Sequence, residues 1–405
     1  MFAYFKEYFD FKVFFVTLGL VAVGLLSVYS ATYDAGAGLI FQRQLMWAGI
    51  GFVGMLAAAI LPLKTIHRMA FPAYVVSLLV LLALLVIGKT VSGSRSWLGV
   101  AGLGGQPSEF AKVAAVLAFA AFLSRSTTLI SDPKHLFAAI TLIVIPMGLV
   151  LVQPDLGTSV VFLAVILPVL YWVGADHFSL AAILSPLLVA AGALFGTSFF
   201  VASVIVSAVL LYVSRKNRFI AAMAFAVTLA VGLSVQFVFE RMPSYQQKRI
   251  MTFLNPEADP LGSGYNVLQA KVAIGSGGMF GKGYLKGTQT QLNFIPEQWT
   301  DFIFCVPGEE FGFLGASIVL VLFGALLLRG LTVGSASKNK FASIAAVGIT
   351  SVFATHLLIN VGMSMGLMPV IGIPLPFLSY GGSALLANMV MSGLLMNFWA
   401  NRKEY

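Results

Sequence analysis

Residues 293–312 have the sequence NFIPEQWTDFIFCVPGEEFG and are followed at 313–328 by FLGASIVLVLFGALLL, which is apolar enough to cross a membrane. The predicted span is 302–328, so Asp301 opens it, and Glu309 should lie about 12 Å deeper at about 1.5 Å per helical residue. Charge inside a bilayer is costly and tends to be kept for function. This stretch therefore predicts a helical membrane protein with a polar site at one membrane face.

The composition of the whole chain agrees with many membrane spans. Of its 405 residues, 59% are hydrophobic and 10% are charged, and the mean hydropathy is +0.95. These values exclude an ordinary soluble domain. The formal charge of +9 fits Lys and Arg in cytoplasmic loops, so we expect no nucleic-acid binding. The single Cys305 can form no disulfide within the chain, and we expect it to be a small residue packed among apolar neighbours.

Stretches of roughly 17–25 mostly apolar residues indicate about twelve spans. The predicted fold is therefore an all-α polytopic transmembrane helix bundle, formed by one integral membrane domain over residues 1–405. The first apolar run is too long for a signal-peptide core and is followed by many others, so we expect it to be retained. The predicted spans are 11–31, 45–63, 70–88, 107–124, 136–153, 156–173, 178–196, 198–214, 219–238, 302–328, 341–367 and 383–400.

The basic residues predict the orientation of these spans. With the N-terminus in the cytoplasm, most Lys and Arg fall in cytoplasmic loops, and the short outer loops hold only Arg43, Lys89 and Arg95. The C-terminus is then cytoplasmic too, and the large loop at about 239–300, between spans nine and ten, faces outward. The two least certain spans are 178–196 and 198–214. If neither crossed the membrane, the predicted orientation would stay the same.

Several ionisable residues gather on the predicted outer face. Glu109 and Lys112 begin the fourth span and share a helix face, so they can neutralise each other. Asp155 lies in the turn QPDLGTS, while Asp301 and Glu309 belong to the start of the tenth span. Each of these could be structural, as a helix-initiating acid or part of a buried ion pair. Their convergence favours a shared outward cavity.

Two outer loops add candidate contacts. In residues 91–112, Trp97 precedes the Glu109–Lys112 pair, although it could equally be an interfacial anchor. Residues 271–287, KVAIGSGGMFGKGYLKG, combine glycine-rich backbone with lysines. This combination suits phosphate or pyrophosphate, but it departs from the Walker pattern.

The predicted outer mouth has no histidine, so proton transfer there must use a carboxylate. His356, in the eleventh span, shares a face with Asn360 and Ser364, which indicates helix–helix hydrogen bonding. A divalent cation such as Mg²⁺, held by carboxylates, stays possible. The segment 372–388, GIPLPFLSYGGSALLAN, cannot be regularly helical at its prolines and should border the cavity.

An outward cavity with carboxylates suits either a transporter or an enzyme that acts on a lipid-linked substrate. A transporter should present polar groups through the whole bilayer, whereas the carboxylates here lie toward the outer face. The pattern therefore favours an enzyme. A scaffold that only recruits a partner would leave these carboxylates without a purpose.

Four long segments, in this order, resemble the SEDS family (shape, elongation, division and sporulation). They are SRSWLGVAGLGGQPSEFAK, VQPDLGTS, the region from YQQKRIMTFLNPEADP to CVPGEEFGFLG, and NVGMSMGLMPVIGIPLPFLSYGGSALLAN. The resemblance implies a peptidoglycan glycosyltransferase that polymerises lipid II into β1,4-linked glycan at the outer face of the bacterial cytoplasmic membrane. The stretch KGTQTQLNFIPE is more similar to elongation members than to division members. A division-type polymerase and a lipid II flippase are the alternatives.

The resemblance also implies roles for individual residues and partners. Asp301 occupies the position of the family's essential carboxylate and is the candidate catalytic base, while Glu310 and Glu309 are expected to be structural partners within the bundle. The implied partners are a class B penicillin-binding protein and membrane lipids, with no certain cofactor. The supporting cavity residues are Trp97, Glu109, Lys112, Asp155 and Glu309. The residues assigned to the departing undecaprenyl pyrophosphate are Arg249, Lys271, Gly277, Gly278, Lys282 and Lys286.

One feature departs from the family pattern. Family members typically have about ten spans, whereas residues 174–238 here are predicted to form three helices where one is usual. The extra pair lies away from the matching motifs, so it should affect lateral contacts more than the chemistry.

Overall fold

The structure, a computed structural model, describes residues 8–404 except 35, 92–93, 101–102, 216, 243, 255–262, 293 and 297. The side chains of 89–91, 94, 95, 100, 103, 245 and 263 also lie outside the described set, so the predicted outer cations Lys89 and Arg95 are not placed. Within the described part of the chain, 11 helices of at least 18 residues are apolar enough to cross a membrane.

Every predicted span overlaps a long helix, and the helical bundle that was predicted is confirmed. The fourth predicted span is α5 (Pro107–Leu123), whose 17 residues pack against α4 and α16. The 11 longer helices are α2 (Phe11–Tyr33), α3 (Gly38–Ile60), α4 (Leu63–Ile87), α6 (Pro133–Val152), α7 (Leu156–Val173), α8 (His177–Phe195), α9 (Thr197–Ser214), α10 (Arg218–Arg241), α15 (Gly312–Ala336), α16 (Lys340–Ser364) and α17 (Gly382–Ala400).

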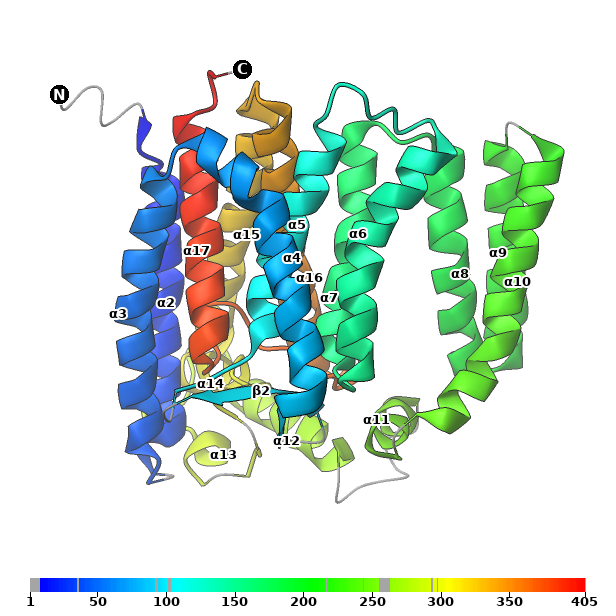
Figure 1. The fold of residues 1–405 in the computed structure, drawn as a ribbon. Coiled ribbons are helices and arrows are strands. Elements are labelled where there is room, and N and C mark those ends of the chain that lie inside the picture. The colour runs from blue at the N-terminus through cyan, green and yellow to red at the C-terminus, as the bar shows by residue number, and fades with distance from the viewer. Residues whose placement is uncertain are drawn as a thin grey trace.

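Helix α16 forms the centre of the bundle, and α8 to α10 form one edge. In the most apolar window of α16, 78% of the residues are buried, compared with 11% in α9 and in α10. Figure 1 shows α8 to α10 as a lateral group, in which α8 packs against α9 and α10 and also contacts α7. This group covers the region 174–238, which therefore lies at the periphery of the bundle.

Glycines allow two of the helices to approach closely. A β-carbon added to Gly393 of α17 would overlap the main-chain oxygen of Met55 in α3, and one added to Gly51 of α3 would lie 2.6 Å from the Met389 sulfur. Small residues are typical of helix interfaces in membranes, where lipid is as apolar as the side chains and packing holds helices together. The contact between α3 and α17 therefore depends on both glycines.

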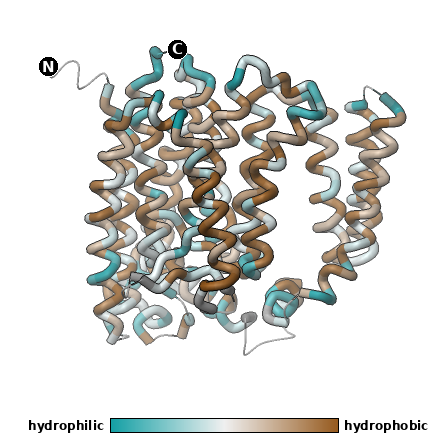
Figure 2. The backbone as a smooth tube through the Cα atoms, in the orientation of Figure 1, coloured by the Kyte–Doolittle hydropathy of each residue, from teal (hydrophilic) through white to brown (hydrophobic). Residues whose placement is uncertain are grey.

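The two ends of the bundle differ. The start of α2 and the end of α17 lie at the same end (Figure 1), where Arg329 and Asp10 form an ion pair at 2.9 Å. The opposite end carries a layer of short elements that is less hydrophobic than the bundle (Figure 2). These elements are β1 (Lys89–Val91), β2 (Ser94–Val100), β3 (Leu103–Gly105), α11 (Ser244–Leu254), α12 (Ser263–Ser276), α13 (Thr288–Gln291) and α14 (Cys305–Glu310). We call them the outer layer.

The strands of the outer layer were not predicted. They form a three-stranded antiparallel sheet in the order β1-β2-β3. Two of the strands have only three residues, and the segment is rich in Ser and Gly without alternating apolar positions. Such a sequence carries little strand signal.

The prediction that the tenth span covers 302–328 is wrong at its start. Residues Cys305–Glu310 form the separate helix α14, and the long helix α15 begins at Gly312, whose φ is +64°. A β-carbon on Gly312 would overlap the backbone nitrogen of Gly281, so both conformation and close packing require glycine here. Glu309 therefore lies in the outer layer, before the span, and not two turns inside it.

Candidate active site

Asp301 lies in the turn that precedes α14, and the main chain of this turn is held by α16 and by the segment that joins α16 to α17. Asn360 Nδ2 donates to the Asp301 main-chain oxygen at 2.9 Å, and Ser379 Oγ donates to the Thr300 oxygen at 2.7 Å. The Tyr380 N–H donates to the next oxygen, that of Trp299, at 2.7 Å. Three consecutive carbonyls are thus fixed by hydrogen bonds, which gives the half-buried Asp301 a defined position.

The side chains of Asp301 and Arg249 meet at Gly372. A β-carbon on Gly372 would lie 3.4 Å from Asp301 Oδ2 and 3.5 Å from Arg249 Nη1. The φ of Gly372 is +71°, a conformation that favours glycine. The carboxylate of the outer turn, the guanidinium of α11 and the backbone of the proline-rich segment therefore come together at one point.

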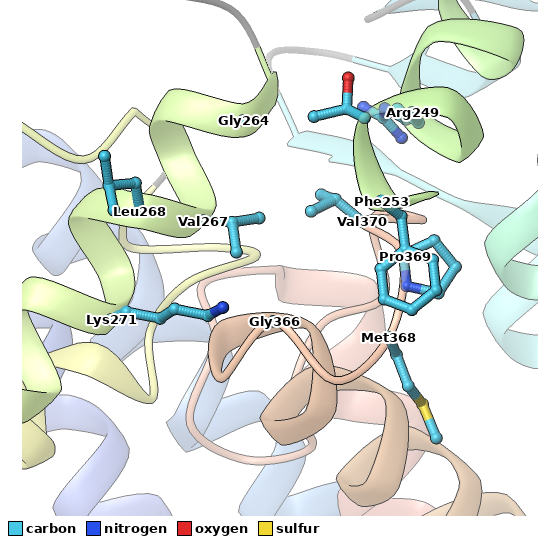
Figure 3. A pocket seen from close by; sticks show the side chains of 11 residues that line it. Arg249, Phe253, Gly264, Val267, Leu268, Lys271, Gly366, Met368, Pro369 and Val370 are labelled. Atoms are coloured by element: carbon cyan, nitrogen blue, oxygen red, sulfur yellow. The ribbon is translucent and has the colours of Figure 1, made fainter. Parts of the chain in front are cut away.

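Arg249 also lines a cavity of about 90 Å³ beside this point. Figure 3 shows Arg249 on one wall and Lys271 of α12 on another, extending toward Gly366. The remaining lining is mainly apolar. Ligand pockets for whole small molecules are usually several hundred Å³, so this cavity could hold only part of a lipid-linked sugar. The other lining residues are Thr252, Phe253, Gly264, Val267, Leu268, Gly366, Met368, Pro369 and Val370.

Glu109 and Lys112 form a buried ion pair at 2.9 Å on α5. Lys112 Nζ also lies 2.9 Å from His356 Nε2 of α16, and His356 Nδ1 lies 2.9 Å from the Pro374 oxygen. The sequence predicted the helix–helix role of His356 but not its partners. The pair therefore contacts the proline-rich segment that borders Asp301, through one histidine.

Asp155 begins α7 and lies near this pair. Its carboxylate accepts from the Thr158 N–H at 3.0 Å and from Gln106 Nε2 at 2.6 Å. Burial raises the pKa of Asp155 above its ordinary value, while the hydrogen bonds from Thr158 oppose this shift. Asp155 thus both caps a helix and ties it to the start of α5.

Trp97 lies on β2, and its ring packs against Gly104 of β3, where an added β-carbon would lie 3.4 Å from Cε3. The sheet connects to the start of α17 through the Gln106 N–H, which donates to Ser383 Oγ at 3.0 Å. The contacts of Trp97 with its own hairpin do not test its predicted role in a substrate cavity, which stays a prediction.

The glycine-rich loop packs against α14. A β-carbon on Gly277 would overlap the Gly308 oxygen, and Lys282 Nζ lies 2.7 Å from Glu309 Oε1. Lys282 is therefore bound to Glu309 and does not line the cavity with Arg249. An added β-carbon on Gly278 would meet nothing within 4 Å, and Lys286 is exposed beside Gly283. The sequence grouped all of these with Arg249 and Lys271, but the structure brings only those two together at the cavity.

Glu309 is fully buried and well supplied with donors. Besides Lys282, it accepts from the N–H groups of Gln289 at 2.9 Å and Thr290 at 3.0 Å. Burial alone would raise the pKa of Glu309, but these hydrogen bonds outweigh burial and hold the pKa below its ordinary value. Glu309 therefore joins α14 to the loop outside the bundle, whereas the sequence predicted a structural partner inside the bundle.

Among the described residues, no group of three or more His, Cys, Asp or Glu side chains is arranged to hold a metal ion. The predicted use of Mg²⁺ is not tested by this geometry.

Comparisons with known proteins give consistent matches over the whole chain. A family model of FtsW, RodA and SpoVE, described as cell cycle protein, matches residues 7–198 and 178–404. The peptidoglycan glycosyltransferase RodA of Treponema pallidum is 34% identical over 97% of this chain and 98% of its own length. The peptidoglycan glycosyltransferase MrdB of Escherichia coli K12 is 35% identical over 98% and 95%.

Solved structures show the same fold. A chain from a peptidoglycan synthase complex, described as coordinating polymerization and crosslinking, has a TM-score of 0.73 and 26% identity, covering 98% of this chain and 99% of that one. The rod shape determining protein RodA of Thermus thermophilus has a TM-score of 0.66 and 25% identity, covering 98% of each chain. The similarity extends over the bundle and the outer layer together.

Proposed function

This chain belongs to the SEDS family, which includes FtsW, RodA and SpoVE, and we propose that it is a RodA-type peptidoglycan glycosyltransferase. It polymerises lipid II into β1,4-linked glycan strands and releases undecaprenyl pyrophosphate. Relatives named peptidoglycan glycosyltransferase align over nearly the full length, and the RodA and MrdB proteins among them support the elongation role over the division role.

The observation that carries this proposal is that Asp301 and Arg249 come together beside Gly372, next to the cavity that Arg249 and Lys271 line. A lipid-linked sugar donor has an anionic pyrophosphate between an apolar chain and a sugar. Two cations among mainly apolar side chains suit that junction, and a carboxylate beside them lies where the sugar would react. The cavity is then the pyrophosphate subsite, with the sugars extending outside it.

In the reaction, the C4 hydroxyl of the acceptor sugar attacks the anomeric carbon of the donor. Asp301 takes the hydroxyl proton as the new C–O bond forms, because a sugar hydroxyl is a weak nucleophile without a base. The bond from the anomeric carbon to the pyrophosphate oxygen breaks, and the α-linked donor becomes a β1,4 link. Arg249 and Lys271 face the charge that develops on the leaving pyrophosphate. A divalent cation, where present, would add charge at the same oxygens.

The proposed setting is the bacterial cytoplasmic membrane, with both termini in the cytoplasm and the outer layer on the extracytoplasmic side. This orientation follows from the positive residues of the short loops. The partner is a class B penicillin-binding protein that crosslinks the strands. Support comes from the similar chain in a peptidoglycan synthase complex.

The test is polymerisation of labelled lipid II by purified protein, with and without the penicillin-binding partner and with and without Mg²⁺. Asp301→Asn should fold and reach the membrane but form no glycan. The matched control is Asp34→Asn, an exposed acid at the same end of the bundle that has no proposed role and should remain active. Glycan formation by Asp301→Asn would refute the assignment of Asp301 as the base. If the wild type translocated lipid II without polymerising it, the assignment of the protein as a glycosyltransferase would be refuted.

A further inference from the structure

One face of α16 holds both segments that flank the candidate base. Asn360 Nδ2 donates to the main-chain oxygens of Asp301, at 2.9 Å, and Ile373, at 2.8 Å. One turn earlier on the helix, His356 Nδ1 lies 2.9 Å from the main-chain oxygen of Pro374. Two successive carbonyls of the proline-rich segment are therefore attached to α16, immediately after Gly372, beside which the Asp301 carboxylate lies.

His356 also contacts α5 through its other nitrogen. Nε2 lies 2.9 Å from Lys112 Nζ, which in turn lies 2.9 Å from Glu109 Oε1. The exposed fraction of each of these three residues is at most 2%. An ammonium can only donate and a carbonyl can only accept, so we assign the imidazole as neutral, with its proton on Nδ1. The ring then accepts from α5 and donates to the proline-rich segment at the same time.

We propose that His356 is a positioning residue for glycosyl transfer, an inference that rests on the proposed function. It joins the ion pair of α5 to the Pro374 carbonyl and so fixes the backbone at Gly372, where the Asp301 carboxylate and the Arg249 guanidinium meet. His356 does not touch the reacting groups. Its effect is geometric, and a displacement of about 1 Å in an active site can cost roughly a hundredfold in rate.

Two substitutions separate the two contacts of the ring. In His356→Asn, the amide nitrogen can replace Nδ1 as the donor to Pro374, but the side chain is too short to reach Lys112. In His356→Gln, the amide oxygen can still accept from Lys112, but no donor remains at the position of Nδ1. The contact with Pro374 is the one nearer the base, so the Gln variant should lose more activity.

The measurement is the steady-state kinetics of lipid II polymerisation. We expect kcat to fall roughly a hundredfold in His356→Gln and about tenfold or less in His356→Asn, with KM within about twofold of the wild type in both. A control on the same helix is Ser351→Ala, because Ser351 is buried but donates only to Val347 of its own helix, at 2.8 Å. It should keep the wild-type kcat. Thermal unfolding of each variant in detergent separates altered geometry from loss of folding.

Several results would overturn the proposal. Equal losses in the Asn and Gln variants that follow a lower melting temperature would make His356 a purely structural residue. A rise in KM with unchanged kcat would place it in substrate binding. If Asp301→Asn is inactive while both His356 variants keep the wild-type kcat, only the positioning role fails. If Asp301→Asn polymerises lipid II, the proposed function fails instead.

Discussion

Replacing Glu309 with Gln tests how α14 is held to the glycine-rich loop and α13 within the outer layer. The buried carboxylate accepts from Lys282 Nζ at 2.7 Å and from the Gln289 N–H at 2.9 Å through Oε1. Through Oε2 it accepts from the N–H and Oγ1 of Thr290, both at 3.0 Å. Glutamine has nearly the same shape, but its amide turns one of these acceptors into a donor that faces other donors.

The expected cost follows from which oxygen becomes nitrogen. The amide nitrogen costs less at the position of Oε2 than at that of Oε1. At Oε2 it displaces Thr290 Oγ1, which already lies 3.3 Å from the Gly287 oxygen and can donate there instead. The buried Thr290 N–H then has no acceptor, at about 1–3 kcal/mol, and the remaining bonds lose their charge assistance. Lys282 is 25% exposed, so its ion pair adds little. We expect a loss of about 3 kcal/mol in the local free energy of unfolding.

The assay is hydrogen–deuterium exchange of residues 277–291 in detergent at neutral pH, since a loss of about 3 kcal/mol predicts exchange that is roughly a hundredfold faster. Glu310→Gln is the matched control, because Glu310 is equally buried but accepts from the neutral side chains of Ser30 and Gln291. It should change exchange by less than about fivefold. Unchanged exchange in Glu309→Gln, or equal effects of the two substitutions, would refute this reasoning.

The same carboxylates predict a pH dependence. The pKa of Glu309 is lowered, so the stability it contributes is present above the unfolded-state pKa of about 4.3 and is lost as the pH falls through the folded-state pKa. The pKa of Glu310 is raised, mainly by burial, so its ionisation weakens the fold as the pH rises through that value. Protection of 277–291 should therefore fall in acid in the wild type but much less in Glu309→Gln.

Two further pairs of substitutions test the packing of the loop and the cavity. Gly281→Ala should lower the melting temperature, because φ is +81° and the new β-carbon would overlap the Glu310 oxygen; Gly275→Ala on α12, where nothing lies within 4 Å, should not. Lys271→Met should raise KM for lipid II about tenfold with little change in melting temperature, whereas Lys282→Met should leave KM unchanged. Equal kinetic effects of the two lysine substitutions would contradict the separation of Lys271 from the glycine-rich loop.

The bundle was predictable from the sequence because each span needs only an apolar run of sufficient length. The start of α15 was not, since in FIFCVPGEEFGFLG apolar residues stand on both sides of Glu309 and Glu310, and the stretch can be taken as one span. The break depends on a left-handed glycine packed against Gly281, a contact between segments about thirty residues apart. Composition in a sliding window carries no information about such a contact.

The glycine-rich loop shows why the candidate site was only partly predictable. Glycine lets backbone approach phosphate closely, but it lets backbone approach backbone equally well. Here Gly277 and Gly281 contact the main chain of α14, and Lys282 pairs with Glu309. A loop that binds phosphate and a loop that packs against another main chain can therefore have the same glycine-rich sequence. Only the position of α14 decides between them.

The placement of Lys271 relative to Asp301 follows from a small cluster separate from the main core. Ala270 and Ala273 of α12 pack in it with Phe302, next to Asp301, and with Met363 of α16. Lys271 is therefore carried by a helix whose buried neighbours also fix the turn of the candidate base. Since tightly packed clusters transmit displacements, the cation and the base cannot shift independently. A catalytic arrangement that must hold a leaving group and a base at once requires such a shared support.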